Sequence, residues 1–174
     1  ISFCSPVCRL PPDATDIKID YSSLSSTIRA LTENETDEVA LMATVVCELR
    51  HADGRFDWTG FYRVSEPGLM KIGTYQGGHG CLQIPFDHGV CGAAARTGEV
   101  QLVDDVDAFP GHIACASSTR SEIVLPVWNG RGAVIAVLDI DSDQPAAFDQ
   151  TDADGLAAIL RQVFGGSDGG KRRS

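Results

Sequence analysis

Apolar positions near the start of the chain recur every three or four residues, which is the spacing of one helix face. Two such runs follow each other: Leu24, Ile28 and Leu31, then Val39, Ala43, Val46 and Leu49. Thr32 and Glu35 stand three residues apart before the second run, which is the spacing of a capping box. The pattern therefore predicts two amphipathic helices at the beginning of the fold.

Further along, the pattern changes to short segments rich in β-branched and aromatic residues, separated by turn-forming residues. The predicted strands are residues 58–64, 69–75, 100–103, 122–127 and 133–140, and residues 82–85 form a further short apolar piece. A helix of small residues is expected from Val90 to Gly98. Asp149 or Thr151 can cap a closing helix. Helices, then hairpin-linked strands, then a last helix indicate an α+β fold with a central antiparallel β-sheet flanked by helices.

Length and composition fit a single domain. The chain has 174 residues, of which 43% are hydrophobic and 22% are charged, so a sizeable core can form. Residues 1–18 carry several prolines and no regular period, and residues 165–174 have the composition of a flexible tail. We therefore expect one folded domain over residues 19–164, between an N-terminal extension and a C-terminal tail.

The formal net charge of −10 argues against nucleic acid and anionic membrane surfaces as partners, because both require a concentrated basic face. No apolar run reaches the roughly 18 residues that a membrane-spanning helix needs. The start of the sequence also lacks the basic and apolar regions of a signal peptide. These features favour a cytoplasmic location.

Three of the six cysteines lie where a thiol can take part in chemistry. Cys81 follows a glycine-rich loop at residues 77–80. Cys91 falls in the first turn of the predicted small-residue helix, and Cys115 lies in polar surroundings. A helix N-terminus lowers the pKa of a nearby thiol and raises its thiolate fraction. Such positions favour nucleophilic or redox work, although small buried cysteines that act only as hydrophobes are common.

The other three cysteines are assigned no role. Cys47 falls on the apolar stripe of the second helix and is expected in the core. Cys4 and Cys8 lie in the extension, where a C-x-x-x-C spacing without a second ligand pair is weak support for a metal site. No cofactor and no metal ligand are therefore assigned from the sequence.

Three acidic residues are candidates for one site on the sheet. Asp139 and Asp141 are two residues apart at the end of an apolar strand, so their side chains share one face, roughly 6.6 Å apart along the backbone. Glu122 begins the preceding strand. If all three face one pocket, burial and repulsion raise at least one pKa and keep a carboxyl protonated near neutral pH. The alternative is that acids at strand ends cap turns or face water.

The first predicted strand carries three aromatic residues. Trp58 and Tyr62 share one face of that strand because side chains alternate, and Phe61 points to the other face. One face can therefore pack in the core while the other lines a pocket.

Six short segments carry motifs that occur together in one known family: residues 58–62, 77–81, 89–92, 105–115, 121–124 and 137–142. In order and content they resemble the free methionine-(R)-sulfoxide reductases, a GAF-fold family, over roughly residues 20–163. The sequence departs from the family where the loop before Cys81 reads Gly78-His79-Gly80 in place of the usual Lys and Pro. Three cysteines in these motifs are far more specific than a GAF fold alone, which also occurs in ligand-binding domains.

The resemblance implies that the protein reduces free L-methionine (R)-S-oxide to L-methionine. Cys115 matches the attacking cysteine, which becomes a sulfenic acid and then forms a disulfide with a second thiol. Cys81 and Cys91 match the partner positions of that disulfide, and the division between them stays open. A thioredoxin-type reductant would restore the thiols. A homodimer is the family-level expectation.

The resemblance also implies roles for the acids and the aromatic residues. Glu122, Asp139 and Asp141 resemble the residues that hold the sulfoxide and the substrate ammonium, and a protonated carboxyl among them would donate to the sulfoxide oxygen. Trp58 and Tyr62 resemble the wall around the substrate methyl group. A charged ammonium paired with these acids would explain selection of the free amino acid over a peptide-bound residue.

Two other classes of protein stay open as alternatives. A non-enzymatic GAF sensor that binds a small ligand would need the pocket but no redox cysteines. A zinc-binding structural module would use the cysteines as ligands, although they lack paired C-x-x-C spacing. Activity that survives in Cys115→Ser would support the sensor, and stoichiometric zinc after purification would be required for the zinc module.

Overall fold

The structure, a computed structural model, describes residues 19–111 and 117–165. Its helices are α1 (Tyr21–Leu31), α2 (Glu38–Ala52), α3 (Gly89–Thr97) and α4 (Gln150–Phe164), with a short 3-10 helix, η1, at Val106–Ala108. Its strands are β1 (Trp58–Glu66), β2 (Leu69–Gln76), β3 (Gln83–Pro85), β4 (Gln101–Val103), β5 (Ser121–Trp128) and β6 (Val134–Ser142). Every helix and strand expected from the sequence is present. The N-terminal extension and the tail beyond Gly165 fall outside the described residues, so the domain boundaries stay predictions.

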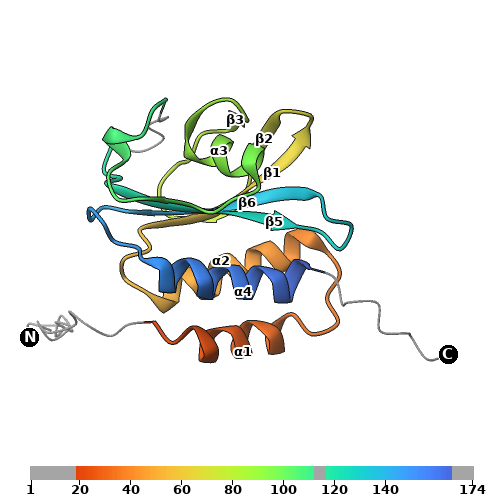
Figure 1. Cartoon of the computed structure of the whole chain (residues 1–174). Helices are drawn as coiled ribbons and strands as arrows, with labels where there is room; N and C mark the ends of the chain where they lie inside the picture. The colour runs from red at the N-terminus through yellow and green to blue at the C-terminus, as the bar shows by residue number, and fades with distance from the viewer. Residues whose placement is uncertain (1–18, 112–116, 166–174) are drawn as a thin grey trace, which may run out of the picture.

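The strands form one antiparallel sheet in the order β3-β2-β1-β6-β5-β4. Figure 1 shows α2 and α4 on one face of the sheet, α1 outside them, and α3 on the opposite face. The predicted α+β architecture, with a central antiparallel sheet flanked by helices, is confirmed. Within the described part of the chain, every helix is too short or too polar to span a bilayer.

Side chains of β1 alternate between two apolar clusters, one on each face of the sheet. Phe61 lies in the cluster formed with α2 and α4, whereas Trp58 and Tyr62 lie in the cluster beneath α3. Burial of each such aromatic side chain contributes about 1.5–3 kcal/mol to the free energy of unfolding. The separation of Phe61 from the other two aromatic residues is confirmed, and the two faces of β1 pack in different clusters.

The start of α2 differs from its prediction. Asp37 is the N-cap, and its side chain accepts a hydrogen bond from the Ala40 N–H at 2.9 Å. Thr32 instead ends α1, where its hydroxyl donates to the Ile28 carbonyl at 2.7 Å. The capping box predicted at Thr32 and Glu35 was therefore wrong, because these residues belong to the turn between the two helices.

The apolar stripe of α2 is rotated from the predicted one. Val39 is 50% exposed, and Cys47 is only half-buried, with its Sγ 3.8 Å from His51 Nδ1. The buried positions are Leu41, Met42, Val45, Val46 and Leu49. The core position predicted for Cys47 was wrong, because the face that packs on the sheet passes through Leu41 and Val45.

Asp152, in the first turn of α4, joins three separate segments. It accepts the Asp149 N–H at 2.9 Å, which completes a capping box at the N-cap predicted for this helix. It also accepts the Tyr21 hydroxyl at 2.8 Å and the Arg55 guanidinium at 3.1 Å. Arg55 pairs in addition with Asp53 at 2.6 Å. These hydrogen bonds and ion pairs link α1 and the segment before β1 to the start of α4.

Gly155 leaves room for the Tyr21 ring where α1 packs on α4, because a β-carbon at this position would overlap the ring. We expect Gly155→Ala to displace the ring and to lower the free energy of unfolding by roughly 1–3 kcal/mol, as at other overpacked sites. Urea unfolding followed by circular dichroism measures this change. The control is Gly54→Ala, at a position with no atom within 4 Å. Equal stabilities of the two variants would contradict the packing described.

Candidate active site

The register of the three central strands brings the predicted site residues together. Two cross-strand rows contain most of them: Trp58, Asp141 and Glu122 in one, and Gly60, Asp139 and Val124 in the next. Neighbouring strands lie about 4.8 Å apart, so acids that are far apart in the sequence become neighbours. Glu122 on β5 and the two aspartates, Asp139 and Asp141, on β6 thus lie together on two adjoining strands, and Trp58 lies on β1 beside them.

Helix α3 places Cys91 against these acids. Cys91 Sγ lies 3.9 Å from Glu122 Oε1, and the ligand atoms of Cys91, Glu122 and Asp139 are all within 4.8 Å of one another. The three residues are only 3%, 5% and 6% exposed, respectively. Cys91 therefore occupies the first turn of α3 as predicted, but the accessible position expected for its thiol was wrong.

Small residues allow α3 to approach its neighbours this closely. A β-carbon at Gly92 would lie 2.7 Å from the Pro85 carbonyl oxygen, and the following alanines, 93–95, are buried. Real β-carbons do not come so near to a backbone oxygen. Glycine at position 92 is thus required for the depth at which α3 sets Cys91.

Burial raises the pKa of all three carboxyl groups in the acidic cluster of Glu122, Asp139 and Asp141. Loss of hydration first, and then the charges of Asp139 and Asp141, raise the pKa of Glu122 well above its usual value. Loss of hydration and the Asp139 charge also raise the pKa of Asp141. Burial raises the pKa of Asp139 to about 6. The predicted upward shift of carboxyl pKa values is confirmed.

The pKa of the Cys91 thiol is raised, contrary to the effect expected of a helix N-terminus. Burial is the largest cause, followed by the charges of Asp139 and Glu122. Because the thiolate would lose its hydration and face carboxylates, these effects outweigh the helix dipole. Cys91 is a free thiol, and in these surroundings it is a poor nucleophile.

Trp58 and Tyr62 form an aromatic wall in the same apolar cluster as Cys91. Their rings stack with centroids 5.8 Å apart. The Trp58 indole N–H donates to the Gly78 carbonyl at 3.2 Å. A β-carbon at Gly80 would lie only 2.8 Å from the Tyr62 hydroxyl oxygen. The absence of a side chain at Gly80 therefore lets the loop at residues 77–80 pack directly on the wall.

The structure gives different states to the cysteines predicted for the site. Cys81 follows the glycine loop and packs, half-buried, against the cluster that contains the aromatic wall. It is disulfide-bonded, whereas Cys91 and Cys47 are free thiols. Cys115, predicted as the attacking residue, lies outside the described residues. Its role, like the roles of the other site residues, stays a prediction.

A cavity of about 530 Å³ opens beside the acidic cluster. Its lining residues are Asp57, Trp58, Gly78, His79, Ser117, Ser118, Thr119, Asp141 and Asp143. The Asp57 carboxylate accepts the Asp143 N–H at 2.8 Å, which holds two of the acidic residues together. Carboxyl groups around one cavity favour a cationic group such as an ammonium.

Several of these lining residues were missed by the sequence analysis. Asp57 immediately precedes Trp58, and a carboxyl next to a predicted pocket residue is a signal that could have identified it. Asp143 continues the alternation of Asp139 and Asp141 by one more step. Residues 117–119 carry no motif, so only the fold reveals that they line the cavity.

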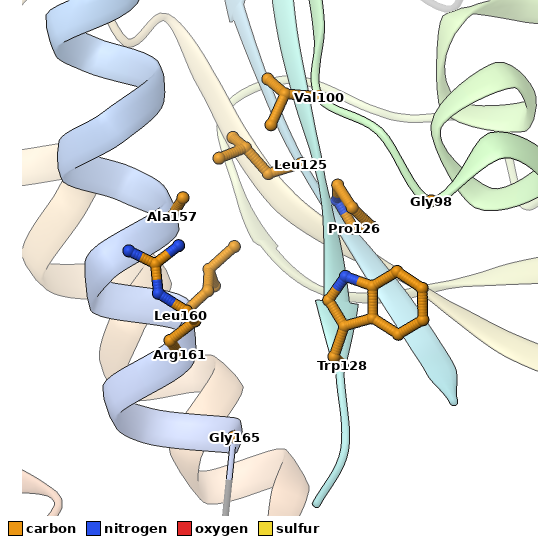
Figure 2. Close-up of a pocket in the computed structure, with 9 residues that line it drawn as sticks. All are labelled: Gly98, Val100, Leu125, Pro126, Trp128, Ala157, Leu160, Arg161 and Gly165. Carbon is orange, nitrogen blue, oxygen red and sulfur yellow. The ribbon is translucent and has the colours of Figure 1, made fainter. Parts of the chain in front are cut away.

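A second cavity, of about 220 Å³, lies between α4 and the end of β5 (Figure 2). Its lining residues are Gly98, Val100, Leu125, Pro126, Trp128, Ala157, Leu160, Arg161 and Gly165. Arg161 is the one ionisable side chain among them. This lining has no carboxyl group, so it lacks the acidic residues that make the first cavity suited to a cationic group.

Residues 35–163 match the family model for the GAF domain. Together with the six-stranded antiparallel sheet and the site beneath α3, this match makes the chain a GAF-domain protein. More specific relatives share most of its length. Free methionine-R-sulfoxide reductase of Escherichia coli (strain K12) is 37% identical over 143 residues, which cover 82% of this chain and 86% of that protein.

Solved structures lead to the same family. Free methionine-R-sulfoxide reductase from Neisseria meningitidis in complex with its substrate is 42% identical, with a TM-score of 0.78 over 82% of this chain and 85% of that one. The reduced form of fRMsr of Staphylococcus aureus is 34% identical, with a TM-score of 0.81 over 85% of this chain and 95% of that one. The chain therefore belongs to the free methionine-R-sulfoxide reductases, a family of oxidoreductases.

The raised pKa of Asp139 predicts how stability depends on pH. The folded-state pKa of about 6 exceeds the unfolded value of about 3.9. The folded protein therefore retains this proton to a higher pH than the unfolded chain does. The resulting stabilisation is complete below about pH 4 and is lost as the pH rises through 6. Relative to Asp139→Asn, the wild-type free energy of unfolding should fall by up to about 1.4 kcal/mol per pH unit in this window.

Urea unfolding of wild type and Asp139→Asn at a series of pH values measures this difference. Asp107→Asn removes the same kind of group at an exposed position and is the matched control. Its profile should run parallel to that of wild type. A constant difference between wild type and Asp139→Asn across the window would contradict the pKa assigned to Asp139.

Proposed function

We propose that this chain reduces free L-methionine (R)-S-oxide to L-methionine with a cysteine thiolate. The observation that carries the proposal is the buried cluster of Cys91, Glu122 and Asp139 beside the wall of Trp58 and Tyr62. One small site thereby offers a protonated carboxyl, a second carboxyl and an aromatic surface. Membership of the reductase family supports the same reaction.

Glu122 is the group best suited to hold the sulfoxide oxygen. Its pKa is raised well above the usual value, which favours the protonated form, and that form can donate a hydrogen bond to the S=O group. Asp139, with a pKa raised to about 6, supplies a second carboxyl that can accept a hydrogen bond. A donor fixed where negative charge develops on the oxygen stabilises the transition state more than the ground state.

The carboxyl groups of the larger cavity are suited to the substrate ammonium. Asp141 lines this cavity with Asp57 and Asp143, and Trp58 lines it as well. An ammonium gains charge-assisted hydrogen bonds from these groups, whereas an amide nitrogen in a peptide does not. The free amino acid is therefore the preferred substrate, with the methylsulfinyl end near the aromatic wall.

Cys115 is the proposed nucleophile. Its thiolate attacks the sulfoxide sulfur, and a protonated carboxyl supplies the proton that the oxygen requires. The oxygen passes to Cys115, which is oxidised to a sulfenic acid, while the substrate sulfur is reduced and methionine leaves. One thiol and one sulfoxide are thus converted into one sulfenic acid and one thioether.

Cys81 is the proposed second thiol, in preference to Cys91. Its disulfide-bonded state and its place after a glycine-rich loop both favour this role. The Cys91 thiol, in contrast, is buried, and its pKa is raised. Condensation of the Cys81 thiol with the sulfenic acid releases water and forms an intramolecular disulfide. A thioredoxin-type dithiol then reduces that disulfide and is itself oxidised.

Purified protein supplied with a thiol reductant should release methionine from the free R epimer, but not from the S epimer or from N-acetylated substrate. Cys115→Ser should abolish release because no thiolate attacks the sulfur. Cys47→Ser, on α2, should leave it unchanged. Chromatographic detection of methionine measures all these reactions. A folded, reduced protein that releases no methionine from either epimer would refute the proposal and favour a ligand-binding GAF sensor.

Cys81→Ser should separate the first oxidation from recycling. A reduced sample without added reductant should still release up to one methionine per chain, because Cys115 can be oxidised once. Turnover with a thioredoxin system should fall by at least about tenfold, because no second thiol forms the exchangeable disulfide. If Cys91→Ser lost thioredoxin-dependent turnover while Cys81→Ser kept it, the roles of the two residues would be reversed.

A further inference from the structure

The cluster of Cys91, Glu122 and Asp139 has the donor atoms and the spacing of a zinc site. One thiol and two carboxyl groups offer ligand atoms that all lie within 4.8 Å of one another. Zinc binds sulfur at about 2.3 Å and carboxylate oxygen at about 2.0–2.2 Å, so tetrahedral geometry separates the two ligand atoms by roughly 3.6 Å. The separation of 3.9 Å between Cys91 Sγ and Glu122 Oε1 is close to this value.

A buried carboxyl oxygen in this cluster is a second, independent observation that favours a bound cation. Asp139 is only 6% exposed, and its Oδ1 atom is buried without a hydrogen-bond partner among the described residues. A buried oxygen without a partner is unfavourable by about 1–3 kcal/mol. Coordination to a cation would satisfy it. Cys91 is also a free thiol, so its sulfur is available as a ligand.

The three residues are held by separate elements of the fold. Cys91 belongs to α3, Glu122 to β5 and Asp139 to β6, and strand pairing fixes Val124 opposite Asp139 and Glu122 opposite Asp141. The ligands therefore converge on one point from the helix above and from two paired strands below. Convergence from rigid elements favours a defined coordination site over a flexible acidic surface.

We infer that the reduced protein binds one zinc ion through Cys91, Glu122 and Asp139, with a water molecule as the fourth ligand. Zinc fits this mixed set because it accepts thiolate and carboxylate together, whereas calcium and magnesium prefer oxygen alone. Each ligand that is protonated in the free protein releases its proton to solvent when the ion binds. No electron transfer is involved.

Zinc at this position would have a consequence for catalysis. The ion would occupy the place proposed for the sulfoxide oxygen and would engage the carboxyl that donates to it. Zinc should then inhibit methionine release until a chelator removes it. This consequence rests on the proposed function, whereas the binding site itself does not.

Cobalt substitution tests the site without any enzyme assay. The full chain is treated with a chelator, reduced with a phosphine, separated from both and titrated with Co²⁺ alone. We expect saturation at one ion per chain and a near-ultraviolet thiolate-to-cobalt charge-transfer band, which Zn²⁺ then abolishes by displacement. Cys91→Ser should lose the band. Glu122→Gln and Asp139→Asn should each weaken binding by at least about 100-fold.

Two controls make the test specific. Cys47→Ser removes a thiol outside the site and should keep both the band and the affinity. Glu122→Gln and Asp139→Asn preserve side-chain shape, so they test the site even if Cys91→Ser fails to fold, as judged by circular dichroism. The inference is overturned if wild type shows no thiolate band, if folded Cys91→Ser retains it, or if both isosteric variants bind cobalt as wild type does. Because no sulfoxide is present, failure of the reductase proposal would not affect any of these results.

Discussion

The packing of α3 on the central strands removes Cys91, Glu122 and Asp139 from water, and the chemistry of the site follows from that burial. A carboxylate without hydration is unfavourable by several kcal/mol unless a partner compensates it. Burial therefore raises the pKa of Glu122 and favours its carboxylic acid form, which can donate a hydrogen bond. The same loss of hydration keeps the neighbouring thiol of Cys91 protonated. One physical effect thus creates a proton donor and suppresses a nucleophile at the same place.

Burying polar groups in this site is unfavourable, so the rest of the sheet must supply the stability of the fold. The face of the sheet that packs on α2 and α4 is apolar and includes Phe61 among its buried residues. The opposite face carries the acids together with Trp58 and Tyr62. Because side chains alternate along β1 and β6, each strand contributes to both faces at once. The apolar face stabilises the strands whose other side holds groups that are unfavourable to bury.

The site also requires that its strands, its loop and α3 approach one another closely, and glycine residues allow this at several points. A β-carbon at Gly60 would lie 2.5 Å from both the Trp58 ring and the Tyr75 β-carbon, so the aromatic stack of Trp58 on Tyr75 depends on this glycine. Gly80 and Gly92 have the same function for the loop and for α3. Side chains at these positions would hold the elements apart and admit water. The low dielectric of the site, and hence its raised pKa values, depends on them.

The sequence by itself determined the elements and the local sharing of faces. Helical and alternating periods depend on which residues must be buried along one element, so they predicted the order of helices and strands and the separation of Phe61 from Trp58. The stripe of α2 was misread because apolar residues on that helix fit more than one face. Only packing against the sheet selects Leu41 over Val39.

Tertiary structure alone decided how these elements combine into a site. Strand register joined Glu122 to Asp141, and the depth of α3 brought Cys91 within reach of both strands. The sign of the Cys91 pKa shift was also non-local: a helix N-terminus favours the thiolate, but burial beside carboxyl groups favours the thiol. Sequence spacing describes the distance along one element, whereas hydration and charge at a site depend on what other elements cover it.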